Sequence, residues 1–177
     1  MEREIQSQFG AVAERYVGSA VHARGIDLPI LIDAAAPRRD ERALDLGTAV
    51  GHTAFALAAR AGLVVGVDLT AEMLSQASRL AAERSIDNVR FVRADVTNLP
   101  FPDATFDIIS SRLSAHHYAH VEQVVEEVAR LLRSHGRFIL SDTVAPDDAF
   151  LDTFINAVEI LRDRSHVRDH SVRQWQA

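Results

Sequence analysis

Five short apolar runs, separated by segments of helical periodicity, constrain the fold of this chain more than any other feature. The runs are rich in Val, Ile, Leu and Phe, and most are apolar on both faces. They occupy residues 42–47, 63–68, 89–95, 106–111 and 136–142. Strands of this kind favour a parallel sheet with right-handed crossovers and helices on both faces. The sequence therefore predicts an α/β fold.

Helical segments connect these runs and also precede them. Apolar spacing predicts helices over 52–61, 70–85 and 120–134, with a loop between the third and fourth strands. A second N-terminal helix is expected in "IDLPILIDAAA", which ends at Pro37. A first one is indicated by an apolar stripe made of Ile5, Phe9, Val12, Ala13 and Tyr16.

The chain has 177 residues, of which 47% are hydrophobic, and this suffices for one compact domain with a core. We expect a single domain over 1–177. It would comprise an N-terminal helical cap (1–37), a five-strand core (41–145) and a C-terminal helical segment (146–177).

Charge and composition exclude several classes of partner. The net charge of -6 gives no field that attracts a nucleic acid, and the only arginine cluster, over 162–173, is interrupted by aspartates. Cysteine is absent, so neither disulfides nor thiolates contribute. No apolar stretch approaches the roughly 18 residues that a membrane span needs. We therefore expect a cytoplasmic protein without a membrane span or a nucleic-acid partner.

Polar residues follow each apolar run, at the point where the predicted strand ends. Asp45 to Gly47 end the first run, Asp68 the second and Asp95 the third, and polar residues occupy 110–112 and 141–143. Ligands of open parallel sheets bind outside the carboxyl ends of the strands. These residues are therefore expected to converge on one ligand-binding edge.

The turn after the first strand, in "ALDLGTAVGHTAFALAAR", is built from small residues. Gly47, Ala49 and Gly51 would let a ligand approach the free amides of the helix start, although small residues also permit close helix–strand packing. The spacing is G-x-A-x-G, whereas a dinucleotide-binding turn needs a small residue at position 52, which is His. The spacing thus disfavours a nicotinamide-dependent oxidoreductase, which stays an alternative.

Two acids at successive strand ends indicate the kind of ligand. Asp68 lies 21 positions after Gly47, where an acid can accept both hydroxyls of a ribose, although it is also placed to cap the next helix. Asp95 could accept from the amine of adenine, or be an ordinary loop residue. No Lys or Arg lies in the turn to neutralise a phosphate. Together these features predict a pocket for an adenosine with a non-phosphate tail.

Four ordered motifs then resemble a known family: "ALDLGTAVGHTAFALA", "VVGVDLTAEMLSQA", "VRFVRADVTNLPFPDATFDIISSR" and "EEVARLLRSHGRFILSDTVAPDD". Over residues 5–175 the chain resembles the class I S-adenosylmethionine-dependent methyltransferases. It is most similar to the small-molecule branch typified by ubiquinone/menaquinone biosynthesis methyltransferases. The resemblance implies a Rossmann-like parallel sheet, S-adenosylmethionine as cofactor, S-adenosylhomocysteine as product and a small-molecule methyl acceptor.

The resemblance also implies roles for individual residues of the cofactor site. Asp68 with Leu69 would hold the ribose, Met73 would pack near the adenine, and Asp95 with Val96 would contact its amine and ring. Backbone around Arg112 and Leu113 would face the sulfonium. The methionine side would be lined by Asp45, Gly47, Thr48, Ala49 and Gly51. The family usually has Gly where Ala49 stands, so we expect at worst some loss of cofactor affinity.

The run "SAHHYAH" offers candidates for a base that assists methyl transfer. His117 is the first candidate and His116 the second, while ordinary loop residues are the alternative. His116 and His120 have the spacing of a helical metal-ligand pair, but no Cys exists and no carboxylate ligand is evident, so no metal is predicted. Tyr16, and with it His22, resembles the family's N-terminal segment that closes over the cofactor, although Tyr16 also suits the end of an apolar stripe.

The family's fold continues past the fifth strand with a helix and two more strands, whereas this chain ends at "SVRQWQA". We therefore expect these C-terminal strands to be missing and the fifth strand to be exposed at the sheet edge. Such an edge favours self-association, or cover by the helical stretch "FLDTFINAVEILRD". A non-catalytic S-adenosylmethionine-binding module is accordingly a further alternative to an active enzyme.

Overall fold

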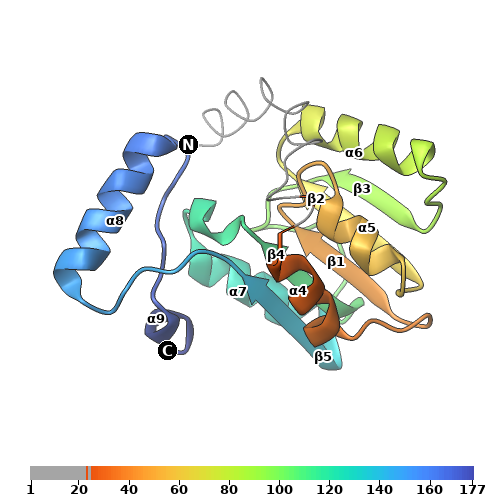
Figure 1. The fold of residues 1–177 in the computed structure, drawn as a ribbon. Helices are drawn as coiled ribbons and strands as arrows, with labels where there is room; N and C mark the ends of the chain where they lie inside the picture. The colour runs from red at the N-terminus through yellow and green to blue at the C-terminus, as the bar shows by residue number, and fades with distance from the viewer. Residues whose placement is uncertain (1–22, 24) are drawn as a thin grey trace.

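The computed structural model describes residue 23 and residues 25–177. The first predicted N-terminal helix, with Tyr16, and the candidate His22 lie outside these residues. In chain order the elements are α4 (Asp27–Ala35), β1 (Arg42–Leu46), α5 (His52–Ala58), β2 (Leu63–Asp68), α6 (Ala71–Glu83), β3 (Val89–Arg93), β4 (Phe106–Arg112), η1 (Ala115–His117), α7 (Val121–Leu131), β5 (Leu132–Ser141), α8 (Ala149–Arg162) and α9 (Val172–Trp175) (Figure 1).

All five predicted strands form one parallel sheet, in the order β3-β2-β1-β4-β5. The chain moves outward from β1 through β2 to β3, and then returns to the other side of β1 with β4. This reversal places a topological switch point between β1 and β4, where ligands of open α/β sheets bind. The predicted Rossmann-like α/β fold is thus confirmed, with the last strand starting at Leu132 rather than at residue 136.

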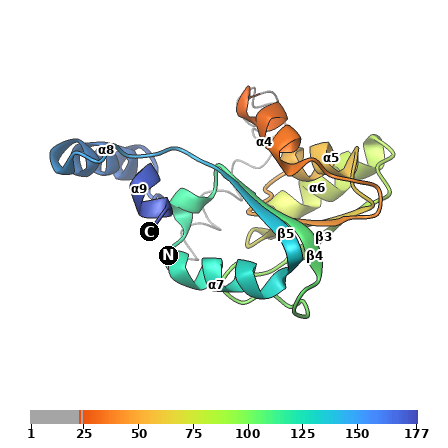
Figure 2. The same ribbon diagram turned by 90° about the horizontal axis from the view of Figure 1, so that it is seen from below.

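Helices cover both faces of the sheet, and Figure 2 shows α7 on one side and α4, α5 and α6 on the other. Alternate residues of β1 explain the two layers, because Ala43 faces the α4–α6 side while Leu44 and Leu46 face the α7 side. The α7 stripe contributes Val124, Val128 and Leu131 to its core, all at most 4% exposed.

The strand β5 lies at an edge of the sheet, and of the two alternatives expected there, cover by the next helical stretch is wrong, whereas self-association stays a prediction. Both views show α8 well to the side of the sheet (Figures 1 and 2). Most of its large apolar side chains stay exposed, including Phe150 at 75% and Leu161 at 84%. Periodicity predicted the helix correctly, but an apolar stripe does not specify which surface it meets. Among the described helices, none has the length and apolarity to cross a bilayer.

Candidate functional site

The turn between β1 and α5 has an unusual backbone. Gly47, Ala49 and Gly51 all have positive φ angles, at 63°, 47° and 91°. Glycine adopts this conformation without strain, whereas an alanine carries a steric cost. A Cβ on Gly47 would lie 2.6 Å from the Cβ of Ser114, so this turn packs directly against the segment that follows β4.

The buried carboxylate of Asp45, at the end of β1, stabilises this turn by hydrogen bonds. Asp45 is only 1% exposed, and its carboxylate accepts the hydroxyls of Thr48 at 2.7 Å and Ser110 at 2.8 Å. Burial raises the pKa of Asp45 to about 6, against the lowering effect of these two hydrogen bonds. Asp45 and Gly51 do not line the cavity described below, so they support the turn and do not form the ligand surface.

Asp68 joins two parts of the site. Its Oδ2 accepts the amide of Ala49 at 2.9 Å, and its Oδ1 accepts the amide of Thr70 at 2.8 Å, at the start of α6. Burial raises the pKa of this carboxyl, while these two bonds and others oppose the effect. The carboxylate therefore serves the helix start, as one interpretation of the sequence held, and also borders the cavity.

Asp95 is fixed in a similar local way. Its Oδ1 accepts both the amide and the hydroxyl of Thr97, at 2.9 and 2.8 Å. Val96 lies between them and lines the same cavity. The end of β3 thus presents a carboxylate, an apolar side chain and a hydroxyl within three residues.

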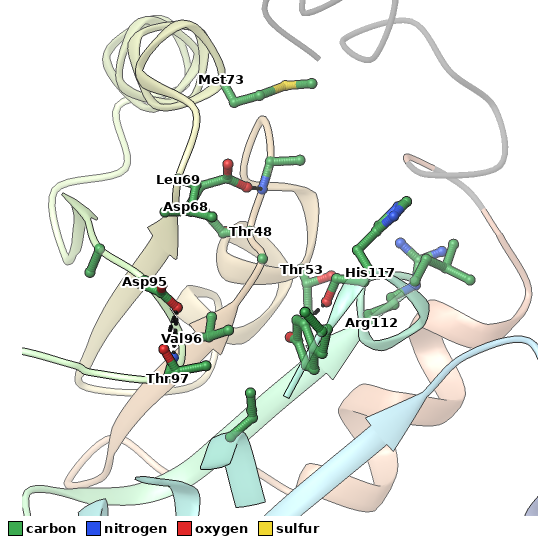
Figure 3. Close-up of a pocket in the computed structure, with 18 of the residues that line it drawn as sticks. Thr48, Thr53, Asp68, Leu69, Met73, Asp95, Val96, Thr97, Arg112 and His117 are labelled. Carbon is green, nitrogen blue, oxygen red and sulfur yellow. Dashed lines mark hydrogen bonds between the residues drawn. The ribbon is translucent and has the colours of Figure 1, made fainter. Parts of the chain in front are cut away.

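These strand ends surround a cavity of about 310 Å³, within the range of small-molecule sites. We call its two parts the strand-end half (47–50, 52, 53, 68, 69, 73 and 94–97) and the η1 half (112–114, 117–120 and 124). Figure 3 shows Asp68 and Asp95 on one side of the cavity and Arg112 and His117 on the other. Eleven of the residues that the sequence assigned to the cofactor site or to the base line it: Gly47, Thr48, Ala49, Asp68, Leu69, Met73, Asp95, Val96, Arg112, Leu113 and His117.

Sequence reasoning missed several residues of the lining: Val50, His52, Thr53, Ala94, Thr97, Ser114, Tyr118, Ala119 and Val124. Two of them lie close to predicted residues, because Thr97 is two positions after the strand-end residue Asp95 and Thr53 is two positions after Gly51 of the small-residue turn. Tyr118 carried no such signal. Its hydroxyl meets those of Ser111 and Ser114 at 2.9 and 3.0 Å, beneath the glycine turn, and burial raises its pKa, which keeps it neutral.

Arg112 spans the end of β4 and the start of α4. Its Nη2 donates to Oδ1 of Asp27 at 2.9 Å and its Nε donates to Oδ2, while its side chain is 3% exposed. The guanidinium lowers the pKa of Asp27 through this hydrogen bond. Among the described residues that line the cavity, Arg112 is the only arginine, and the bidentate pair neutralises it.

The three histidines of the predicted loop have different surroundings. His120 lines the cavity, and His117 lines it too while donating from Nδ1 to the carbonyl of Ser165 at 2.9 Å. His116 lies outside the lining, and its Nδ1 is 2.6 Å from Oδ1 of Asp142. Tyr16, the third catalytic candidate, lies outside the described residues.

One expectation about His116 was wrong, since carboxylates do lie beside it. Donor atoms of His116, Asp142 and Asp169 lie within 4.8 Å of one another. These groups already bond to the protein: Asp142 accepts from His116 and from backbone amides, and Asp169 accepts the hydroxyl of Thr143 at 2.5 Å. The three side chains are thus held together by hydrogen bonds within the protein, and the expectation of no metal stays a prediction.

The fold and the cavity define a class of protein. A glycine turn without a basic residue, followed by acids at the ends of β2 and β3, suits an adenosine with a non-phosphate tail at the switch point of a parallel sheet. S-adenosylmethionine is such a molecule, and the carboxylate acceptors and apolar side chains of the lining fit it.

Comparison with known proteins agrees with this class. A family model described as a methyltransferase domain matches residues 44–140. The chain is 45% identical over 172 residues to an uncharacterized methyltransferase, YcgJ, of Bacillus subtilis, and 36% identical over 117 residues to a demethylmenaquinone methyltransferase of Thermus thermophilus. These matches cover 97% and 65% of the chain, and 68% and 53% of the relatives.

The crystal structure of the Bacillus subtilis YcgJ protein superimposes with a TM-score of 0.82 at 46% identity, covering 84% of this chain and 64% of that one. The chain therefore belongs to the methyltransferase domain family, within the class I S-adenosylmethionine-dependent methyltransferases. S-adenosylmethionine is the cofactor of this class, and the family resemblance found in the sequence is confirmed.

Proposed function

We propose that this protein transfers a methyl group from S-adenosylmethionine to a small-molecule acceptor. The observation that carries the proposal is a single cavity bordered by the glycine turn, by Asp68 and Asp95, and by a histidine on its far side. The strand-end half would bind the cofactor. The η1 half would bind the acceptor.

The residues of the strand-end half have the chemistry that the cofactor needs. Asp68 would accept the ribose hydroxyls, because each carboxylate oxygen has lone-pair capacity beyond the one amide that each now accepts. Asp95 would accept the amine of adenine, with Leu69, Met73 and Val96 as apolar contacts of the ring. The amides and small side chains of residues 47–49 would face the methionine part.

When bound, the cofactor supplies an electrophilic methyl group on a positively charged sulfur. Transfer breaks the sulfur–carbon bond, whose electron pair stays on sulfur, and forms a bond from carbon to the acceptor. The protein then contributes mainly by positioning. An acceptor with an O–H or acidic C–H group also loses a proton, and His117 is placed to take it.

The names of relatives support a small acceptor. They include demethylmenaquinone methyltransferases, a 27-O-demethylrifamycin SV methyltransferase and a nocamycin O-methyltransferase. The acceptors in these names differ widely from one another. We therefore propose the class of reaction and leave the acceptor to experiment.

Calorimetry with S-adenosylhomocysteine tests cofactor binding. We expect the protein to bind S-adenosylhomocysteine saturably and not to bind NAD at the same concentration. NAD binding without S-adenosylhomocysteine binding would overturn the proposal. Incubation with methyl-labelled S-adenosylmethionine and a cell extract then tests transfer. Binding without any labelled product would favour the non-catalytic binding module.

A further inference from the structure

Asp142 organises the segment that carries the histidines. Its side chain is 3% exposed, and its Oδ2 accepts the amides of Ser114, Ala115 and His116 at 3.1, 2.6 and 3.3 Å. Its Oδ1 accepts the amide of Thr143 at 2.8 Å and lies 2.6 Å from Nδ1 of His116. One buried carboxylate at the end of β5 thus fixes both the backbone of η1 and the ring of His116.

A second set of contacts comes from the segment after α8. The carbonyl of Ser165 accepts Nδ1–H of His117, and the amide and hydroxyl of Ser165 donate to Asp163 at 2.8 and 2.6 Å. The amides of Val167 and Arg168 donate to the carbonyl of His116 at 2.8 and 3.1 Å. Residues 163–168 are therefore docked on η1, although they lie about 50 positions further along the chain.

The contact with Ser165 determines the tautomer of His117. A carbonyl oxygen can only accept, so Nδ1 of His117 must carry the proton. In a neutral ring, Nε2 then holds the lone pair that can accept a proton. Since His117 lines the cavity, this tautomer is the one that a general base needs.

We infer that His116, Asp142 and Ser165 are positioning residues that hold His117 as a neutral, Nδ1-protonated base beside the acceptor. This inference rests on the proposed function. It goes beyond it by naming the groups that set the tautomer and charge of the base. It also restricts the acceptor to one that still carries the proton to be removed.

The electrostatics of the cluster support this arrangement. Burial lowers the pKa of His117, and the charge of His116, whose ring centroid is 4.1 Å away, lowers it further; the Ser165 carbonyl, Asp163 and Asp142 oppose both effects. Burial also lowers the pKa of His116, but Asp142, Asp169 and Asp163 outweigh it and raise the net value. The pKa values of the pair therefore move in opposite directions, and a shared proton favours His116 over His117.

Other charged or titratable groups also border the cavity near His117. The Arg112–Asp27 pair comes from β4 and α4, Asp68 lies across the cavity at the end of β2, and His120 lines it beyond η1. His166 stacks on His116 with ring centroids 5.5 Å apart, and burial lowers its pKa. None of them contacts Nδ1 of His117, which is bonded to Ser165.

Long-range proton–nitrogen NMR of protein with ¹⁵N-labelled histidine tests the inference without any acceptor. We expect His117 to be neutral with its proton on Nδ1 at pH 7, and His116 to have a higher pKa than His117. In His116→Asn, the amide keeps a hydrogen bond to Asp142 and removes the charge. The pKa of His117 should then rise, because the charge of His116 lowers it in the unsubstituted protein. A proton on Nε2, or an unchanged pKa, would overturn the inference.

A second variant and a matched control complete the test. Asp142→Asn should lower the pKa of His116, because it removes the partner charge, and an unchanged value would contradict the ion pair. His135→Asn, at an exposed position of β5, should leave His117 unchanged. S-adenosylhomocysteine affinity should stay within about twofold in His116→Asn, which shows that the cavity is intact. If the unsubstituted protein does not bind S-adenosylhomocysteine, the proposed function is overturned, but the tautomer assigned to His117 is not affected.

Discussion

The two halves of the cavity are built in different ways. In the strand-end half, carboxylates bond to nearby chain: Asp95 reaches two residues ahead, and Asp68 bonds to Thr70 and to the turn 19 residues before it. In the η1 half, contacts join distant segments, with 85 positions between Arg112 and Asp27 and 48 between His117 and Ser165. The order of the strands in the sheet therefore brings the residues of the strand-end half together. The second half depends on how separate segments dock.

Substitution of His117 should separate the halves most sharply. His117→Ala removes the proton acceptor of the η1 half, so methyl transfer in the labelled-donor assay should fall by about 100- to 10,000-fold. S-adenosylhomocysteine affinity, measured by calorimetry, should change little, because the cofactor is assigned to the other half. His135→Ala serves as the control. Retained transfer in His117→Ala would make this histidine an ordinary loop residue.

The contact between the halves is tested at Gly47. Gly47→Ala forces a methyl group to within 2.6 Å of the Cβ of Ser114 and imposes a positive φ on alanine. The free energy of unfolding should fall by about 2 to 4 kcal/mol, as measured by urea denaturation.

A double variant distinguishes the two causes at this position. Ser114→Gly removes the colliding atoms, so adding it to Gly47→Ala should recover the steric part of the loss and leave the backbone part. Strictly additive effects would show that the turn and the segment after β4 do not meet as described.

Within the strand-end half, Asp68 should govern cofactor affinity. Asp68→Ala should weaken S-adenosylhomocysteine binding by about 1.5 to 3 kcal/mol, because a charged acceptor is lost. Asp87→Asn, at an exposed position, is the matched control. Unchanged calorimetric affinity in Asp68→Ala would remove this residue from the proposed ribose contact, whatever happens at His117.

The same contrast explains what the sequence could predict. Asp68 and Asp95 were identifiable because they end apolar runs, and parallel strands bring their carboxyl ends together. Asp142 was recognisable as a strand end, but nothing in its sequence neighbours indicated that it bonds to His116. Ser165 gave no signal, since the docking of residues 163–168 depends on tertiary contacts. The apolar stripe of α8 predicted a helix and could not predict its exposed position.

The smallest effect is expected at Ala49, where the chain departs from the family's usual glycine. Ala49 has a φ of 47°, which costs an alanine about 1 to 2 kcal/mol, whereas a glycine at this position costs about 0.5 to 1 kcal/mol in the entropy of the unfolded chain. Ala49→Gly should therefore stabilise the protein by about 0 to 1.5 kcal/mol in thermal unfolding. Because the amide of residue 49 still reaches Asp68, cofactor affinity should be equal or slightly higher. A clear loss of affinity would mean that the alanine methyl itself contacts the cofactor, and that the strand-end half is shaped by side chains as well as by backbone.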